Sequence, residues 1–277
     1  MSVRNWTLLL FLGGHRLAAQ APAAEPPPPI MDNSFLVEEA YNQERGVVQH
    51  INTFSHSVHG TSWVYTFTQE WPLSGQRHQL SYTIPVAREG DASPATTGIG
   101  DIAINYRYQA LGISDTRFAF APRLTVLLPT GDSRRGLGAG GTGFQLNLPF
   151  SAALSSRFVA HSNAGVTFTP RARNALDNSA PTLSYALGQS VIWLVHPKLN
   201  LLLENAWTVT QDVIGSGQTE RRTELLLSPG LRGAIDFASG LQIVPGIAFP
   251  FGIGHDRGES SVFLYLSFEH PFGHRAP

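Results

Sequence analysis

Cysteine is absent from this chain of 277 residues, and Lys198 is the only lysine. Without thiols the protein has no disulfide, no thiolate metal ligand, no cysteine nucleophile and no cysteine for a lipid anchor. Charged residues make up 14% of the chain, against roughly 25% in a typical soluble domain. The formal net charge of −1 argues against nucleic acid as a partner, because nucleic-acid-binding surfaces carry a basic stripe.

Long apolar runs are also lacking after the N-terminus. A helix needs about 20 consecutive apolar residues to cross a bilayer, so the sequence excludes helical membrane spans. Long segments in which apolar and polar residues alternate are present instead. Few charges combined with many long alternating strands are typical of a transmembrane β-barrel. All-β barrels of this length often form a single domain.

The first 46 residues are expected to precede the barrel. Residues 1–21 contain Arg4, a short apolar core and the sequence Ala19-Gln20-Ala21, which together predict a cleaved signal peptide. Residues 22–46 follow as a stiff proline-rich tether and a short helical segment, for which residues 32–34 supply capping side chains. We interpret the helical segment as a periplasmic lead-in to the first strand, and a plug lying in the pore is the alternative.

Residues 47–277 carry the predicted barrel, an up-and-down antiparallel sheet of about 12 strands with ten as the fallback. Strands of about ten residues cross a bilayer at a tilt, whereas strands of globular proteins average roughly five or six. Short and long polar connections alternate along the chain, as the turns and outside loops of bacterial outer-membrane barrels do. The predicted strands are residues 47–57, 62–71, 78–87, 99–110, 117–129, 142–154, 157–169, 181–194, 199–210, 221–236, 241–252 and 260–271.

Aromatic side chains also favour a membrane protein. Trp63, Tyr65, Phe67 and Trp71 share one face of their segment. Such residues form girdles at both interfaces of transmembrane barrels. A soluble all-β sandwich is the alternative, because its strands alternate too. Strand length, the leader peptide and the order of the connections favour the barrel.

Polar side chains on the opposite faces of these strands are predicted to project into the lumen. They carry both signs of charge, so they either pair and close the interior or line a water-filled path and tune passage. A barrel of about 12 strands lies between the filled interior of eight strands and the aqueous channel of 16 to 18. Both outcomes stay open. The predicted pore-lining residues are Asp101, Asn105, Arg107, Gln109, Arg117, Arg123, Gln145, Asn147, His161, Asn163, Glu204, Glu224, Arg232, Asp236 and Glu269.

Several segments carry a resemblance to a known family, among them residues 33–44, 47–50 and 100–101 and the glycine-rich loop of residues 130–141. Phe67-Thr-Gln-Glu-Trp-Pro72, Leu128-Pro-Thr-Gly-Asp132 and Phe144-Gln-Leu-Asn-Leu-Pro149 are similar to outer-membrane proteins grouped under the phenol-degradation meta-pathway name. The likeness covers most of the mature chain. It implies a Gram-negative outer-membrane β-barrel, suspected of passing small or aromatic compounds, and it implies no catalytic residue. These motifs are turn and strand residues, so they specify fold better than activity.

Two other patterns suggest cofactor or metal binding only weakly. Residues 136–141 satisfy G-x-G-x-x-G, but they lead into an alternating strand where a dinucleotide site needs a helix, so we interpret them as a mobile outside loop. His50, His56 and His59 fit no standard metal-ligand spacing. We therefore predict no cofactor and no metal.

Lipid hydrolysis at the membrane surface is the enzymatic alternative, and it needs a serine and a histidine that meet. His161 and Ser162 are neighbours on a strand and point to opposite faces, whereas Ser57 and His59 share a side but have no obvious acid nearby.

The leading prediction is therefore an outer-membrane barrel, bathed in outer-membrane lipids, that gives passive, selective passage to small molecules, including hydrophobic or aromatic ones. A lipid hydrolase and a non-conducting structural barrel are the alternatives. The sequence specifies neither the solute nor the oligomeric state.

Overall fold

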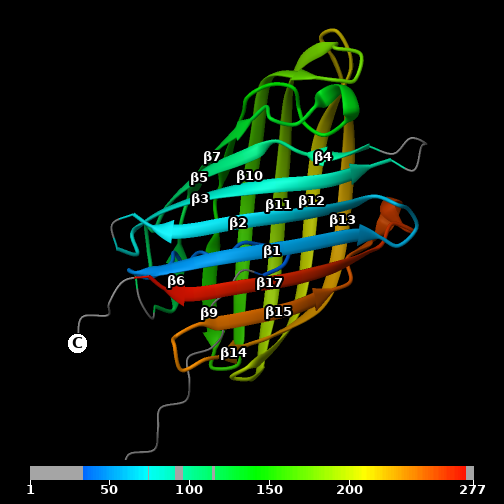
Figure 1. Cartoon of the computed structure of the whole chain (residues 1–277). Coiled ribbons are helices and arrows are strands. Elements are labelled where there is room, and N and C mark those ends of the chain that lie inside the picture. The colour runs from blue at the N-terminus through cyan, green and yellow to red at the C-terminus, as the bar shows by residue number, and fades with distance from the viewer. Residues whose placement is uncertain (1–33, 74, 91–95, 114–115, 273–277) are drawn as a thin grey trace, which may run out of the picture.

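The chain forms a closed antiparallel barrel of twelve strands, built from seventeen β-segments in the part that the structure describes. The computed structural model describes residues 34–272 except 74, 91–95 and 114–115, so the predicted signal peptide and the proline-rich tether lie outside the described residues. Consecutive strands pair around the circuit, and the last strand pairs with the first, from Val47↔Pro271 to Ser57↔Ser261 (Figure 1). The sheet therefore has no free edge.

The twelve predicted strands are all present, and five of them are interrupted by one or two residues. Three of the interruptions contain a proline (Pro122, Pro149 or Pro250), which has no N–H group to donate to a neighbouring strand. The segments are β1 (Val47–Ser57), β2 (Trp63–Pro72), β3 (His78–Glu89), β4 (Thr96–Ile99), β5 (Ile102–Tyr108), β6 (Phe118–Phe120), β7 (Arg123–Leu128), β8 (Gly143–Asn147), β9 (Phe150–Ser155), β10 (Phe158–Arg173), β11 (Ser179–His196), β12 (Leu199–Gly215), β13 (Gln218–Gly233), β14 (Ile235–Asp236), β15 (Gln242–Ala248), β16 (Phe251–Gly252) and β17 (Ser261–Pro271).

Strands β10 to β13 are longer than the sequence predicts. Long loops are expected over residues 170–180 and 211–220, but the strands continue through most of these residues. Only Ser216 and Gly217 separate β12 from β13. The added residues include charged side chains such as Arg171, Arg173 and Asp212, which is why the sequence indicates loops there. These four strands form the tall wall behind β1 to β3 and β17 in Figure 1.

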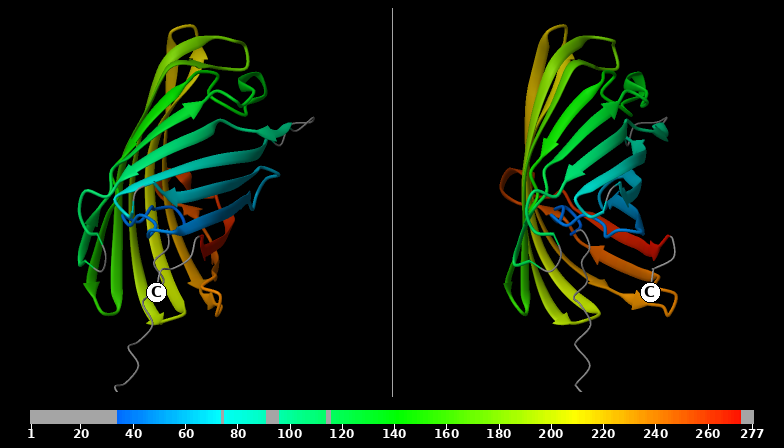
Figure 2. Two further views of the ribbon diagram at one scale, coloured as in Figure 1. Left: turned by 60° about the vertical axis from the view of Figure 1, so that its left-hand side comes forward. Right: turned by 90° about the vertical axis from the view of Figure 1, so that its left-hand side faces the viewer.

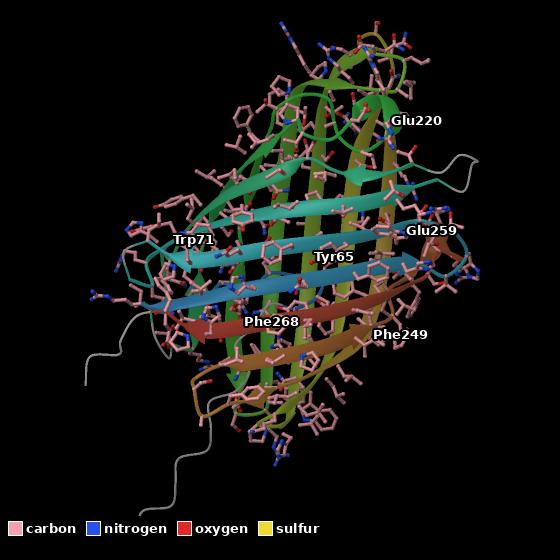
Figure 3. All side chains as sticks on the ribbon, in the orientation of Figure 1. Tyr65, Trp71, Glu220, Phe249, Glu259 and Phe268 are labelled. Atoms are coloured by element: carbon pink, nitrogen blue, oxygen red, sulfur yellow. The ribbon has the colours of Figure 1, made fainter. Side chains whose placement is uncertain are left out.

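The outward face of the barrel is apolar. Leu124, Leu187 and Leu203 are each more than half exposed on their strands. Tyr65 on β2 and Phe268 on β17 lie on the outer surface in Figure 3. A band of this kind faces lipid in transmembrane barrels. Among the described residues, no helix is long and apolar enough to cross a membrane.

A charge placed on this band tests the assignment of the two faces. Leu203→Arg is expected to lower the free energy of unfolding by about 2–4 kcal/mol, because the guanidinium must sit in hydrocarbon. Thr208→Arg, on the inward face of the same strand, is expected to have a much smaller effect, because Thr208 borders a cavity. Urea titration of both variants refolded into lipid vesicles gives the comparison. Equal losses would contradict the assignment.

The N-terminal segment lies inside the barrel, which contradicts the periplasmic lead-in that we expect from the sequence. The predicted helix is also wrong for the described residues, because residues 34–46 contain only bends, turns and irregular backbone. Val37 and Ala40 are 1% and 0% exposed. The blue trace of this segment lies between the walls in Figure 2. Residues 34–43 are called the plug below.

Candidate functional site: a plugged lumen

Glu204, buried on β12, anchors the start of the plug. Its carboxylate accepts hydrogen bonds from the backbone N–H groups of Phe35, Leu36 and Val37 at 3.2, 3.0 and 3.2 Å. One wall carboxylate thus satisfies three consecutive amides, which explains why the plug does not need a helix to satisfy them.

Arg107, buried on β5, anchors the other end of the plug. Its Nε donates to Asn42 Oδ1 at 2.8 Å, Nη1 donates to the Glu39 carbonyl at 3.2 Å, and Nη2 donates to the Tyr41 carbonyl at 2.8 Å. Nη2 also lies 3.6 Å from the Glu70 carboxylate on β2. Because its donors are taken by the plug and Glu70, Arg107 is a structural cation and not a free charge in the lumen.

Side-chain amides of the wall bind the backbone between these anchors. Gln109 Oε1 accepts the N–H of Asn42 at 2.7 Å. Asn163 on β10 binds Glu38 twice: its Oδ1 accepts the N–H at 2.8 Å, and its Nδ2 donates to the carbonyl at 2.8 Å. The lumen wall therefore recognises the plug mainly through main-chain groups, and polar contacts of this kind can be exchanged for water.

Glycines in the wall make room for the apolar side chains of the plug. A Cβ atom at Gly230 or Gly246 would lie 2.7 or 2.6 Å from the ring of Phe35, and one at Gly188 would lie 2.9 Å from Val37 Cγ2. A Cβ contact this short is not found in real structures, so a larger residue opposite an unchanged Phe35 or Val37 would push the plug away. The barrel sequence is thus matched to the plug sequence.

A serine and a histidine meet inside the barrel, but not the pairs expected from the sequence. Ser151 on β9 lies opposite His161 on β10, and Ser151 Oγ is 2.6 Å from His161 Nδ1. The same Oγ accepts the N–H of Ala40 at 2.8 Å, and both side chains are buried. Ser57 ends β1 and His59 follows it in the turn. The Ser151–His161 pair therefore holds the plug; only cross-strand register could have revealed it.

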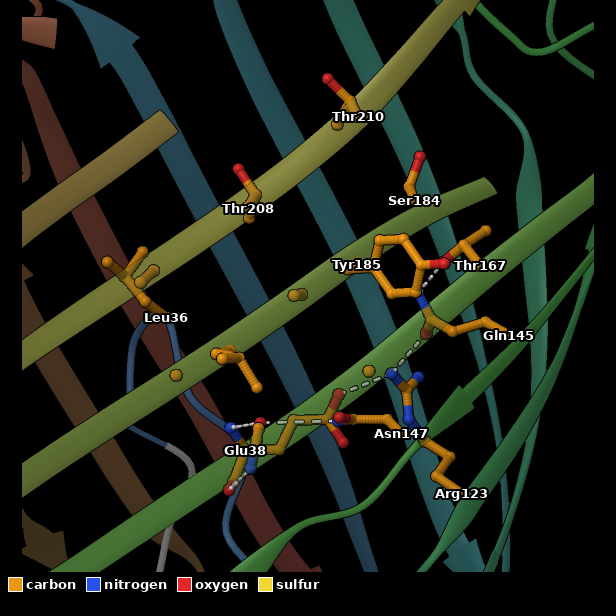
Figure 4. A pocket seen from close by; sticks show the side chains of 16 residues that line it. Leu36, Glu38, Arg123, Gln145, Asn147, Thr167, Ser184, Tyr185, Thr208 and Thr210 are labelled. Carbon is orange, nitrogen blue, oxygen red and sulfur yellow. Dashed lines mark hydrogen bonds and ion pairs between the residues drawn. The ribbon is translucent and has the colours of Figure 1, made fainter. Parts of the chain in front are cut away.

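Two cavities lie beside the plug, with volumes of about 310 and 280 Å³. Both are lined by Leu36 and Glu38 of the plug and by Arg123 of β7. Arg123 Nη2 and Glu38 Oε1 are 2.6 Å apart, so this ion pair stands where the cavities meet (Figure 4). The lumen thus contains open space next to the plug, with one ion pair at its centre.

Most of the predicted pore-lining residues lie on the inward faces of their strands. Glu224 and Glu269 share the parity of the buried Ser228 and Ser267 and lie towards opposite rims of the barrel. The residues that the structure brings into the lumen are Asn105, Arg107, Gln109, Arg123, Gln145, Asn147, His161, Asn163, Glu204 and Arg232.

Three predicted pore-lining residues lie at or just beyond the ends of β-segments. Arg117 is exposed before β6, with its guanidinium over the Phe118 ring. Asp236 is exposed at the barrel rim, where Gln242 and Lys198 bind its carboxylate. The Gln242 hydrogen bond, and then Lys198, lower the pKa of Asp236. These two residues lie at strand ends, where alternation no longer separates an inside from an outside.

Asp101 is the third of these residues, and it organises the glycine-rich loop. It lies between β4 and β5, and its carboxylate accepts the N–H groups of Gly131 at 2.9 Å and Ala139 at 2.7 Å. A Cβ atom at Gly138 would lie 2.4 Å from Asp101 Oδ1. Gly138 of the G-x-G-x-x-G pattern therefore lets the loop approach the Asp101 carboxylate closely. The loop binds a carboxylate of the chain itself and is not a phosphate-binding loop.

The histidines singled out in the sequence do not converge. His50 Nε2 lies 3.2 Å from His270 Nε2 on β17. His56 is six positions further along β1, and His59 follows the strand. In the ranges that the structure describes, no three His, Cys, Asp or Glu side chains gather as metal ligands.

The comparison with protein families decides what this barrel belongs to. The profile of the family described as "Putative MetA-pathway of phenol degradation" matches residues 32–270. The chain belongs to this family. The resemblance seen in the strand and turn motifs is thereby confirmed. Among curated proteins, no sequence matches the chain.

Solved structures share the fold of this family member. The COG4313 outer membrane channel from Pseudomonas putida F1 is similar with a TM-score of 0.62 and 16% identity, over 84% of this chain and 98% of that one. The NanC porin is similar with a TM-score of 0.50 and 8% identity, over 82% of this chain and 100% of that one. At these identities the likeness concerns the barrel fold.

Proposed function

We propose that this protein is an outer-membrane barrel that gives passive, selective passage to small molecules through its lumen, and that the plug closes the lumen. The observation that carries this proposal is the plug itself, held by polar wall contacts beside two cavities that reach its Glu38. Cavities of about 300 Å³ suit only small solutes. The similar structures named as a channel and a porin support the proposal.

The orientation follows from the connections. β1 begins and β17 ends at the same rim of the barrel. Bacterial outer-membrane barrels turn their short connections to the periplasm, and most of the short turns lie at this rim. The plug therefore enters from the periplasmic side, and the two cavities face the outside loops. Solutes enter between the outside loops, and they cross the lumen only after the plug has moved.

A non-enzymatic role fits the one close Ser–His pair described above. Ser151 and His161 are 0% and 2% exposed, and Ser151 already accepts a hydrogen bond from the plug. A hydrolase needs its nucleophile and base to reach a lipid at the membrane surface. The position of this pair supports passage through the lumen over lipid hydrolysis.

An engineered disulfide between plug and wall tests the proposed function. A Cβ atom at Gly188 would lie 3.8 Å from Val37 Cβ, which is the usual Cβ separation in a disulfide. The chain has no cysteine that would compete. We expect Val37→Cys/Gly188→Cys to be silent in planar bilayers when oxidised and to show ion-selective steps after reduction, because only reduction frees the plug.

Gly165→Cys/Ala186→Cys is the matched control, because the Cβ atoms would again lie 3.8 Å apart but both belong to the wall. Its conductance should not respond to reductant. Conductance of the locked plug in both redox states would show that the plug is not the gate. Silence in both states, from protein with heat-modifiable migration, would favour a non-conducting structural barrel.

A further inference from the structure

Arg123 is the accessible cation beside the plug. Its Nη1 donates to Asn105 Oδ1 at 2.8 Å, and its Nη2 donates to Gln145 Oε1 at 2.8 Å. Its Nε is buried and has no hydrogen-bond partner among the described residues. Among the described residues, Glu38 supplies the carboxylate that pairs with Arg123, through Nη2. The guanidinium of Arg123 therefore binds Glu38 through Nη2, although a guanidinium can bind a carboxylate through two nitrogens.

Arg107 lies in the same lumen as Arg123 but has a structural role, and the two differ in their contacts and exposure. Three nitrogens of Arg107 bind the plug, and its side chain is 3% exposed. The side chain of Arg123 is 17% exposed and that of Glu38 is 30% exposed. Buried pairs of charges are costly to separate, but a partly solvated pair is not. Of the two ion pairs, Arg107–Glu70 and Arg123–Glu38, the second is thus the one that a solute can open.

Glu38 can release Arg123 without leaving its place in the chain. Asn163 holds the backbone N–H and carbonyl of Glu38, so these contacts survive when the side chain rotates. The carboxylate then turns into the water of the cavities. Exchange of one carboxylate for another at Arg123 needs only a rotamer change of Glu38, which exposed side chains make on the picosecond to nanosecond timescale.

The larger cavity suits an anion with a small apolar body. Arg123 and Glu38 are the charged residues among those that line it. Its hydroxyl and amide groups, such as Thr167 and Asn147, are neutral. Leu36 of the plug, labelled in Figure 4, and small wall residues such as Ala186 add apolar surface to the lining of this cavity. With Glu38 turned away, the cavity presents one unpaired positive charge.

We propose that Arg123 is the binding site for the carboxylate of a small monocarboxylate with an apolar body, and that this carboxylate replaces Glu38. This inference rests on the proposed function, since it names the class of solute that the lumen passes. Binding removes one of the contacts that hold the plug. A bound solute therefore favours the state in which the plug is released, because it binds that state more tightly.

Calorimetric titration of the refolded full chain in detergent tests the site, with benzoate as the probe and benzamide as its neutral counterpart. We expect benzoate to bind, and Arg123→Gln to weaken binding at least tenfold. Glu38→Gln should tighten benzoate binding roughly tenfold, because the competing carboxylate is gone; tenfold corresponds to ~1.4 kcal/mol. Arg117→Gln removes the same charge outside the lumen and should leave the affinity unchanged. Benzamide affinity should not depend on Arg123.

Three outcomes would overturn the site: no benzoate binding, equal affinities for benzoate and benzamide, or no tightening in Glu38→Gln. The last outcome cannot arise from a folding defect of the Arg123 variant. The binding measurement is independent of conductance. Arg123-dependent binding by a barrel that stays silent after plug release would refute passage and keep the site. Redox-gated conductance without Arg123-dependent binding would refute the site and keep the passage.

Discussion

Glu204→Ala should unseat the plug and raise the conductance of the barrel. The substitution removes the acceptor of three backbone N–H groups. A buried donor left without a partner costs about 1–3 kcal/mol. The docked plug therefore loses several kcal/mol relative to a plug in water, where its amides are solvated. Single-channel recording gives the conductance, and hydrogen exchange of residues 35–37 reports directly on docking.

Glu204→Gln is the matched control, because it keeps the shape of the side chain and one acceptor oxygen. It should give an intermediate loss of protection and fewer openings than Glu204→Ala. If the amides of residues 35–37 stay protected in Glu204→Ala, the carboxylate does not hold the plug. If they exchange freely while the conductance is unchanged, the plug is not what closes the lumen.

Arg107→Leu should destabilise the whole barrel by about 3–5 kcal/mol, which is the usual cost of removing one partner from a buried ion pair. The change removes the ion-pair partner of buried Glu70 and deprives two plug carbonyls, those of Glu39 and Tyr41, of their donor. Urea unfolding of protein refolded into vesicles measures the loss.

The double variant Arg107→Leu/Glu70→Leu should recover part of that stability, because no buried charge is left without its counterpart. The plug carbonyls still lack their donor, so recovery should be incomplete. A double variant as unstable as the sum of the single variants would show that Arg107 and Glu70 act independently.

The sequence predicts the barrel well because lipid and lumen impose opposite chemistry on neighbouring residues. In β5, Ile104 and Tyr106 face outward and Asn105 and Arg107 face inward, as the alternation indicates. The prediction fails where that contrast ends. In the outer parts of β10 to β13 polar residues such as Arg171, Arg173 and Asp212 are frequent, so these parts of the strands have the composition of loops.

Local pattern gave the plug only as the alternative to a periplasmic lead-in. Capping residues before Glu38 and Glu39 predict a helix start, but in the fold Glu204 satisfies the amides that such a cap would satisfy. Glu204 lies on a strand far away in the chain. Likewise, Ser151 and His161 meet through strand register, which periodicity alone does not specify. Arg123 was predicted as a lumen residue, but its plug partner Glu38 was not.

The wall contacts of the plug also dictate the order in which this protein takes shape. Phe35 is 169 positions from Glu204, Ser34 is 156 positions from Ser190, and Ala40 is 111 positions from Ser151. Contacts of such long sequence separation form late, because the loops that they close must first be ordered by other contacts. The plug therefore docks only after the wall strands that hold it, such as β12, have paired with their neighbours. Residues synthesised before every strand find their place late.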